Sequence, residues 1–143
     1  MTTVNVYLTF NGNCEAAFNH YKAVFGGDFN YIGKFKDMPD GEGKPTDPDD
    51  LEKVLHVGLS ISQETMLMGS DTTKEWHDSF QVGNNMSISI TTDSRQEADR
   101  LFKGLSENGK VTMPMNDTFW GDYFGMCTDQ FGINWMVSFP VQG

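Results

Sequence analysis

Apolar and polar residues alternate along several short stretches of this chain, at the two-residue period of a β-strand. In residues 4–10 every second residue is apolar, from Val4 to Phe10, and Tyr7 and Thr9 fall on the opposite face. In residues 53–61 the pattern predicts Leu55, Val57, Leu59 and Ile61 inward, with Val54, His56, Gly58 and Ser60 opposite. Strands are predicted over residues 4–10, 29–35, 53–61, 65–69, 85–92 and 110–113.

Two stretches instead show the spacing of an amphipathic helix. Residues 14–25 carry an apolar stripe from Ala17 to Phe25, with Asn13 as the expected N-cap and Gly26-Gly27 as the stop. Residues 95–108 repeat this arrangement, with Asp93 or Ser94 as the cap and Gly109 at the end. The buried stripe of this second helix is predicted to be Ala98, Leu101, Phe102 and Leu105.

The aromatic stretch at residues 118–137 predicts a β-hairpin. Asp129-Gln130-Phe131-Gly132 separates two apolar runs, and Gly132 can adopt the positive φ of a tight turn. One face of the first strand is predicted to hold Trp120, Asp122, Phe124 and Met126. A single acid among so many aromatic side chains suggests the wall of a pocket.

Two segments are predicted to lie outside the regular elements. Residues 37–50 are rich in Pro, Gly and Asp, which predicts a surface loop, either a lid or a solvated excursion without a role. Residues 70–84 are polar and irregular and predict a linker. Pro114 is expected to end the strand that begins at residue 110.

The order of elements repeats. Both halves are predicted as β-α-β-β-β, with residues 1–69 and 85–139 as the two copies, residues 70–84 between them, and residues 1–143 as a single domain. The fold class is therefore α+β, with curved mixed sheets whose helix-free faces form a cup. The matched positions are Val6 and Leu8 with Ile88 and Ile90, Tyr21 with Phe102, Leu67 with Trp135, His56 with Asp122, and Met68 with Met136.

The net charge of the chain limits the binding partners that we expect. The chain has 20 acidic and 10 basic residues, a formal net charge of −10, so we expect it to bind neither nucleic acid nor an anionic membrane surface. No signal-peptide pattern precedes Val4 and no apolar run approaches the ~20 residues of a transmembrane helix, so the cytoplasm is the expected location. Cys14 and Cys127 are not expected to form a disulfide.

The predicted cup faces supply the candidate site. His56 and Asp122 are the candidate catalytic pair, because an imidazole beside a carboxylate can transfer protons. The alternative for His56 is a side chain satisfied in a polar core or at a dimer interface. The candidate ligand-binding residues are Tyr7, Thr9, Met68, Trp120 and Met136.

Several local motifs resemble one family. They are YLTFNGN at residues 7–13, VFGG at 24–27, MPDG at 38–41, MGSD at 68–71, GKVTMP at 109–114, FWGD at 119–122 and DQFGINW at 129–135. Together with the paired modules, they resemble the PhnB-like branch of the vicinal-oxygen-chelate superfamily, which includes glyoxalase I, extradiol dioxygenases and bleomycin-resistance proteins. The resemblance covers nearly the whole chain and implies a homodimer in which the partner helps to build the cups. It implies no particular reaction, because PhnB-like proteins mostly lack an assigned one.

The superfamily's metal site does not match this sequence. Its metal-using members take His or Gln from the first strand of each half and Glu from the last strand. The first strands here offer Asn5 or Tyr7 and Ser87 or Ser89, and the last strands offer Met68 and Met136. No metal and no cofactor are therefore expected.

Three hypotheses of different classes follow. The first is a metal-free homodimer that binds an unidentified small organic ligand. The second is a lyase or isomerase of the same superfamily that uses His56 and Asp122, or a recruited divalent metal. The third is a purely structural or partner-binding dimer.

Overall fold

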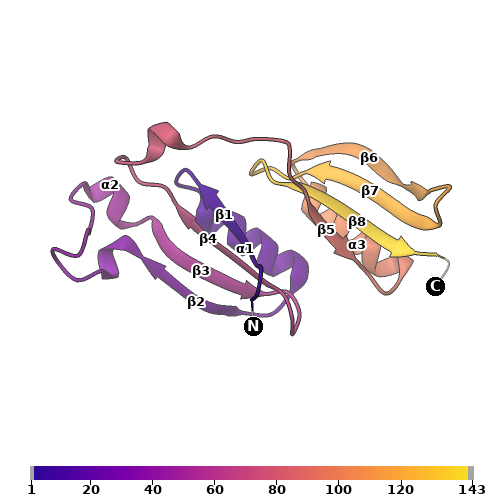
Figure 1. Cartoon of the computed structure of the whole chain (residues 1–143), viewed down its shortest axis with the longest axis horizontal. Coiled ribbons are helices and arrows are strands. Elements are labelled where there is room, and N and C mark those ends of the chain that lie inside the picture. Colours follow the sequence, from indigo (N-terminus) through magenta and orange to yellow (C-terminus); the bar gives the residue numbers. More distant parts are fainter. Residues whose placement is uncertain (1, 142–143) are drawn as a thin grey trace. The chain divides into compact units, whose positions relative to one another are not determined.

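The structure is a computed structural model and describes residues 2–141, apart from the side chain of His77. The chain divides into two compact units, Met1–Gln81 and Val82–Gly143, each with its own sheet and long helix (Figure 1). The first unit contains β1 Val6–Phe10, α1 Cys14–Phe25, β2 Phe29–Lys34, η1 Phe35–Asp37, α2 Pro48–Leu51, β3 Val54–Ser60, β4 Met66–Asp71 and η2 His77–Ser79. The second contains β5 Ile88–Thr91, α3 Arg95–Ser106, β6 Lys110–Asp117, β7 Asp122–Thr128 and β8 Asn134–Pro140.

The two sheets have the same topology. Their strand orders are β1-β4-β3-β2 and β5-β8-β7-β6, with one parallel pair each, β1 with β4 and β5 with β8. Each is an open mixed sheet, so the predicted α+β fold of two β-α-β-β-β modules is confirmed. Val6 pairs with Leu67 as Ile88 pairs with Trp135, which confirms those predicted matches.

One of the predicted matches is wrong. Gly58 pairs with Met68 and Met126 pairs with Met136, so Met68 does correspond to Met136. Counting back two residues from Gly58 and from Met126 places His56 opposite Phe124, not Asp122. The two hairpin loops, residues 61–65 and 129–133, have the same length, so one offset of 68 residues relates both strands, and the predicted match had shifted the first strand by two residues.

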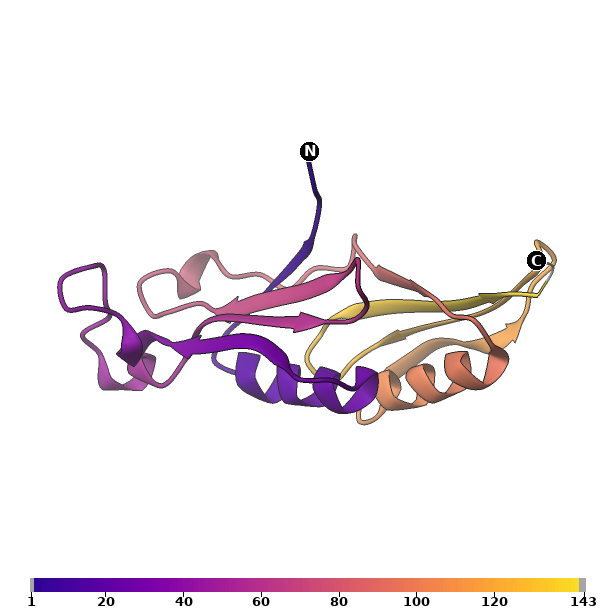
Figure 2. The same cartoon turned by 90° about the horizontal axis from the view of Figure 1, so that it is seen from below.

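Each long helix covers one face of its own sheet (Figure 2). The predicted stripes are buried except for Phe25, which is half-buried; they include Phe18 and Tyr21 on α1 and Leu101 and Leu105 on α3. They pack on the inward residues of the strands, which leaves the other face of each sheet free of helix. Gly69 permits this packing in the first unit, because a Cβ there would lie 2.6 Å from the ring of Phe18.

The buried carboxylate of Asp71 accepts backbone amide hydrogens at the start of α1. Asp71 Oδ1 accepts hydrogen bonds from the amides of Gly12 and Cys14, each at 2.9 Å, and its Oδ2 accepts from the amide of Val54 at 2.9 Å. Asn13 is the N-cap residue of α1, as predicted, but its side chain makes no capping hydrogen bond. In α3, Ser94 is the cap and accepts from the amide of Glu97.

At the start of β3 the buried residues differ from the prediction. Val54 is buried with 1% exposure, whereas Leu55 is 36% exposed. Lys34 pairs with Val54 but Gly33 pairs with His56, so Leu55 is an extra residue in the strand. This bulge reverses the alternation on its N-terminal side.

Pro114 does not end β6, contrary to the prediction. The strand continues to Asp117, with a register shift between Met113 and Asn116. β6 is an edge strand, so the missing amide hydrogen of Pro114 leaves no partner strand unsatisfied.

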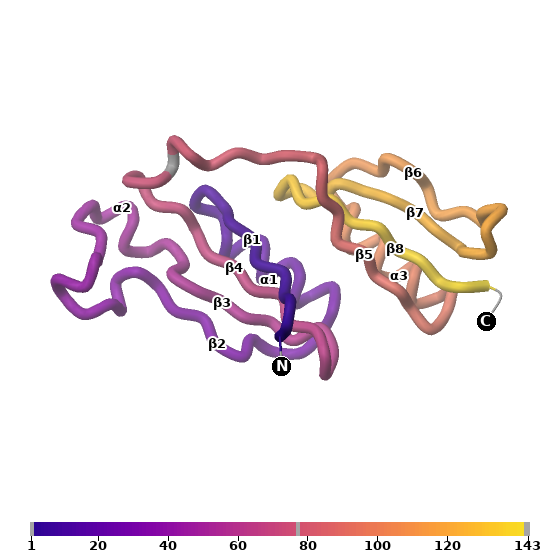
Figure 3. The backbone as a smooth tube through the Cα atoms, in the orientation of Figure 1, coloured from indigo at the N-terminus to yellow at the C-terminus, as the bar shows by residue number. Residues whose placement is uncertain are grey.

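The two predicted irregular segments, whose path Figure 3 shows, also contain regular structure. Residues 37–50 end in the first turn of α2, where Asp50 is buried, and Asp47 caps that helix by accepting from the amide of Asp49. β4 extends through Ser70 to Asp71, and Thr72 and Thr73 are buried, so the predicted linker begins too early. In the described residues no helix is long and apolar enough to cross a membrane.

Candidate functional site

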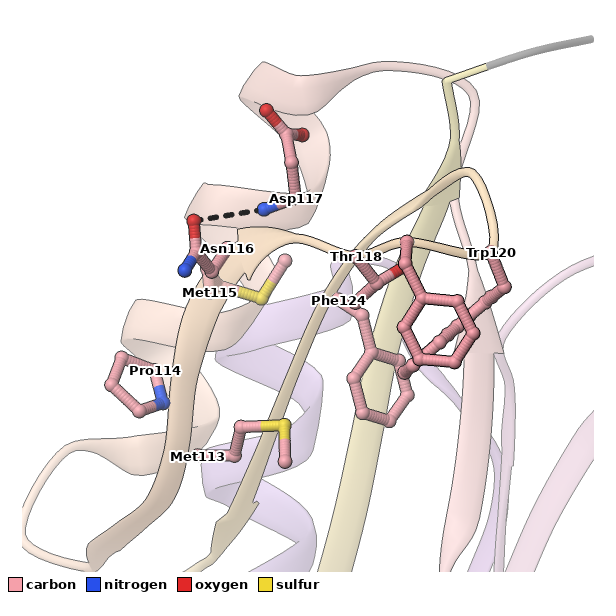
Figure 4. A pocket seen from close by; sticks show the side chains of 9 residues that line it. Met113, Pro114, Met115, Asn116, Asp117, Thr118, Trp120 and Phe124 are labelled. Carbon is pink, nitrogen blue, oxygen red and sulfur yellow. Dashed lines mark hydrogen bonds between the residues drawn. The ribbon is translucent and has the colours of Figure 1, made fainter.

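The second unit contains a pocket beside the turn that joins β6 to β7. It has a volume of about 410 Å³ and is lined by residues 113–120 and by Phe124 (Figure 4). We call it the β6–β7 pocket. Its walls are mainly apolar, formed by Met113, Pro114, Trp120 and Phe124 among others.

The turn itself is held by hydrogen bonds from Thr118. Its hydroxyl donates to the carbonyl oxygen of Asp122 at 2.8 Å and accepts from the amide of Asp122 at 3.2 Å. Gly121 has a φ of 97°, a conformation that favours glycine. The turn therefore presents Phe119 and Trp120 in a defined position.

Asp122 fixes the indole of Trp120. Trp120 Nε1 donates to Asp122 Oδ2 at 3.1 Å, and the Trp120 ring meets Phe124 edge-on, with centroids 5.8 Å apart. Phe119 packs edge-on against Trp120 and is 98% exposed. The predicted acid in the aromatic stretch thus orients an aromatic wall of the pocket.

Polar groups lie at one end of this pocket. Asn116 Oδ1 accepts from the amide of Asp117 (Figure 4). The Asp117 carboxylate accepts from Arg95 at 2.7 Å. The side-chain NH₂ group of Asn116 can donate to a ligand. An apolar cleft with few polar groups is typical of a small-molecule site.

The helix-free face of the first sheet carries a second cluster, centred on His56. The hydroxyl of Tyr7 lies 3.1 Å from Nδ1 of His56, and the hydroxyl of Tyr31 lies 2.8 Å from Nε2. Both phenol rings stack on the imidazole, with interplanar angles of 18° and 19°. We call these three residues the tyrosine–histidine cluster.

Gly58 makes room for this cluster. An ideal Cβ at Gly58 would lie 2.7 Å from Cζ of Tyr31, so the ring lies directly over the backbone of β3. A neutral imidazole has one donor and one acceptor nitrogen, so one phenol donates to His56 and the other accepts from it. The cluster is a directed chain of hydrogen bonds that opens to solvent, because Tyr7 and Tyr31 are both exposed.

The predicted site residues are distributed over both units. Tyr7 and His56 meet in the first unit, and Trp120 and Asp122 meet in the second. Met68 pairs with Tyr7 across the parallel strands, and Met136 pairs with Ser89 in the equivalent place. The predicted pairing of His56 with Asp122 joins residues of different units and stays a prediction.

Thr9 lies at a separate pocket of the first unit. This pocket has a volume of about 460 Å³ and lies between residues 43–50 and residues 70–76. Its lining is mainly polar, in contrast to the β6–β7 pocket.

Sequence reasoning missed Tyr31, Met113 and the role of Phe124. Tyr31 and Met113 lie on β2 and β6, the strands left out when the helix-free faces were assigned. Tyr31 pairs with Gly58 and so lies diagonally across from His56, but residues 35–53 separate β2 from β3, and alternation within each strand does not give the register between them.

Neither cysteine offers a nucleophile. Cys14 and Cys127 are free and buried. Burial raises the pKa of Cys14, helped by the nearby charges of Asp71 and Glu15. Burial and the charge of Asp129 raise the pKa of Cys127 to about 11. Both side chains are therefore neutral thiols at physiological pH.

The side chains at the superfamily's metal positions do not suit a divalent ion. Tyr7 and Ser89 occupy the first strands, and Met68 and Met136 occupy the last strands. Among the residues that the structure describes, no three His, Cys, Asp or Glu side chains gather as a metal site requires. The donor set does not fit the metal of the superfamily, and no metal-dependent step is derived for this protein.

Comparison with known proteins identifies the family. A family model described as 3-demethylubiquinone-9 3-methyltransferase matches residues 2–138. The chain belongs to this family. Protein YjdN of Escherichia coli (strain K12) is 32% identical over 146 residues, covering 95% of this chain and 94% of YjdN.

Solved structures support the same assignment. Protein PA1353 from Pseudomonas aeruginosa is 39% identical with a TM-score of 0.82, covering 97% of this chain and 98% of that one. A Bacillus cereus protein, described as a putative 3-demethylubiquinone-9 3-methyltransferase and PhnB protein, is 22% identical with a TM-score of 0.74, covering 96% and 99%. Glyoxalase-related and bleomycin-resistance family proteins share the fold. The resemblance to the PhnB-like branch is confirmed.

Proposed function

We propose that this PhnB-like protein binds a small, mainly apolar organic molecule in the β6–β7 pocket, as a metal-free homodimer. The observation that carries the proposal is the pocket itself, with its volume of about 410 Å³ and its walls from Met113, Trp120 and Phe124. Ligand pockets commonly measure about 300–1,000 Å³ and combine apolar walls with few polar groups.

The walls favour a flat ligand. Trp120 and Phe124 offer aromatic surfaces, and Met113 offers a flexible thioether that adapts to a ring. Trp120 is held by Asp122 before any ligand arrives, so binding costs little ordering of that side chain. Asn116 would donate to a carbonyl or ether oxygen at the edge of the ligand.

Binding of N-phenyl-1-naphthylamine, a neutral apolar dye, tests the proposal. We expect its fluorescence to rise on addition of the protein and to saturate at one dye per pocket. Met113→Gln should weaken binding about tenfold, because it replaces an apolar wall by an amide without disturbing a buried residue.

Val111→Thr is the matched control. Val111 lies on the same strand with a similar exposure, 45% against 43% for Met113, but does not line the pocket. Equal affinity of both variants for the dye, or no binding by the wild-type protein, would contradict the proposal.

A second candidate function is proton transfer at His56, as in a lyase or isomerase. The observation that favours it is the tyrosine–histidine cluster, in which both imidazole nitrogens are bonded to phenol hydroxyls. In such a chain of hydrogen bonds, one imidazole nitrogen can take up a proton while the other nitrogen releases one. Asp122 would enter this mechanism only if the two units bring it to His56.

Hydrogen exchange of hydroxyacetone in D₂O tests this candidate. Loss of the α-proton signals in the NMR spectrum would be accelerated by the wild-type protein and not by His56→Gln. Equal rates in both proteins would contradict it.

Methyl transfer, the activity in the family's description, has no supporting observation here. Nucleotide-type cofactors often bind where a strand turns into a helix through a glycine-rich loop. At the turn from β1 to α1, the amides of Gly12 and Cys14 are already bonded to Asp71.

A further inference from the structure

The first unit contains a polar pocket that the proposed function does not use. It lies where the parallel strands β1 and β4 both end, and its volume is about 460 Å³. The loop that precedes α2 forms one wall, and the segment after β4 forms the other. Ligands of layered sheets often bind at the carboxyl ends of parallel strands. We call it the α2 pocket.

The two walls are joined by buried and surface charge pairs. Asp50 is 3% exposed, accepts from Lys53 Nζ at 2.7 Å and accepts from the amide of Lys74 at 3.2 Å. Lys74 Nζ in turn binds Asp47 Oδ2 at 2.7 Å. These interactions hold α2 against the segment after β4, so the pocket has its shape in the absence of a ligand.

Hydroxyl groups form its floor. Thr9 and Ser70 pair across β1 and β4 on the helix-free face, and both line the pocket. A hydroxyl can donate and accept at once, so these two side chains suit a ligand that carries hydroxyl groups of its own.

Aromatic side chains form its sides. Phe35 and Trp76 line the pocket, and Trp76 is 64% exposed. A large exposed aromatic surface next to hydroxyl groups suits a molecule with an apolar ring face and a polar rim.

Charge excludes an anionic ligand. The charged lining residues are mostly acids, namely Asp47, Asp50, Asp71 and Glu75 against Lys74. The carboxylates of Asp50 and Asp71 are already bonded to N–H donors, so they repel anions without being free to bind a cation. Asp47 is also paired, with Lys74, so an uncharged ligand fits this lining best.

We propose that the α2 pocket binds a neutral polyhydroxylated ring of monosaccharide size. Its hydroxyl groups bond to Thr9 and Ser70, and its apolar face packs on Trp76. This site differs from the β6–β7 pocket in its unit, in its lining and in the chemistry of its ligand, so either proposal can fail without the other.

Titration of the full chain with myo-inositol and with methyl β-D-glucoside tests this inference. The indole N–H signal of Trp76 in the NMR spectrum should shift with saturation for at least one of them. The variant with both Thr9→Val and Ser70→Ala should bind about tenfold more weakly, since each removes one hydrogen bond.

The second unit supplies a matched control. Thr91 pairs with Ser138 across β5 and β8 as Thr9 pairs with Ser70, so the double variant Thr91→Val and Ser138→Ala makes the same chemical change away from the α2 pocket. We expect it to bind like the wild-type protein, and thermal melting checks that both variants fold. The inference is overturned if neither polyol shifts Trp76, if both double variants bind equally, or if choline or inorganic phosphate shifts Trp76 instead.

Discussion

At the scale of single residues, Gly58 determines whether Tyr31 can reach His56. Tyr31 lies over the backbone of β3 at this position, and its hydroxyl meets Nε2 of His56 at 2.8 Å. No other residue type leaves room for the ring in this place.

We expect Gly58→Ala to displace Tyr31 and break its bond to His56. Stability should fall by only about 1 kcal/mol, because the clash is with the far end of an exposed side chain that can swing away. The ¹⁵N signals of the His56 ring should change, and urea unfolding gives the stability.

Gly33→Ala is the control for this variant. Gly33 pairs with His56, but nothing lies within 4 Å of an ideal Cβ there. Unchanged His56 signals in Gly58→Ala would show that the tyrosine–histidine cluster does not depend on this glycine.

At the scale of elements, Asp71 links α1 and β3. Its carboxylate accepts three amide hydrogen bonds, from Gly12, Cys14 and Val54. We expect Asp71→Ala to lower the free energy of unfolding by about 3 kcal/mol or more, because it leaves buried N–H donors without an acceptor. Urea unfolding measures the loss.

Asp28→Ala serves as its control. Asp28 is exposed and only pairs with Lys22 at 3.4 Å, so its removal should change stability by less than about 1 kcal/mol. Similar losses in both variants would contradict the structural role of Asp71.

The ionisation of Asp50 makes the stability of the protein depend on pH. Burial raises the pKa of Asp50, but the hydrogen bonds from Lys53 and from the Lys74 amide outweigh it and hold the pKa below its ordinary value. A lowered folded-state pKa contributes stability that is present above the unfolded value, about 3.9, and is lost as the pH falls through the folded value.

We therefore expect the free energy of unfolding to fall as the pH drops below about 4. Asp50→Asn should be less stable at neutral pH and should show a shallower fall with acid. The control Asp40→Asn changes an exposed acid paired with Lys44, and it should follow the wild-type curve. Identical acid profiles of Asp50→Asn and wild type would contradict this account.

Local signals in the sequence predicted both long helices and most strand positions, but β5 begins at Ile88 and not at residue 85, and Trp120 lies in the turn before β7 and not in a strand. The bounds of α1 match the prediction, residues 14–25, because an apolar stripe and a glycine stop are properties of neighbouring residues. The features that were missed depend on pairing between strands. The bulge at Leu55 depends on β2, and the tolerance of Pro114 depends on β6 lying at an edge.

In the candidate site, too, local patterns predicted some features, while others depend on pairing between strands. Alternation alone placed Tyr7 and His56 on one face, where they meet. The role of Tyr31 could not be predicted without the β2–β3 register and the space over Gly58. The capping of α1 by Asp71 links residues 57 and 59 positions apart, which no local pattern reveals.

At the scale of the whole molecule, the account predicts no dependence on metal. Thermal melting with EDTA, and then with Zn, Ni, Mn or Fe(II), should give the same midpoint, because Tyr7, Ser89, Met68 and Met136 are poor ligands for these ions. A metal at a hundredfold over its dissociation constant would stabilise the protein by about 2.7 kcal/mol. A shift that disappears in His56→Ala would revive the metalloenzyme hypothesis.

The dimer proposed for the whole molecule is tested separately by light scattering. We expect a mass close to twice 16.0 kDa. A monomeric mass would leave both pockets intact, since each lies within one unit, but would remove the homodimer from the proposed function.

The most direct test of the central claim uses the three tryptophans as reporters. Trp120 lines the β6–β7 pocket, Trp76 lines the α2 pocket, and Trp135 is buried in the core of the second unit. In an NMR titration with N-phenyl-1-naphthylamine, we expect the indole N–H signal of Trp120 to shift with saturation while those of Trp76 and Trp135 stay in place. A dye that binds without shifting Trp120, or shifts Trp76 or Trp135 equally, would contradict the assignment of the β6–β7 pocket as the ligand site.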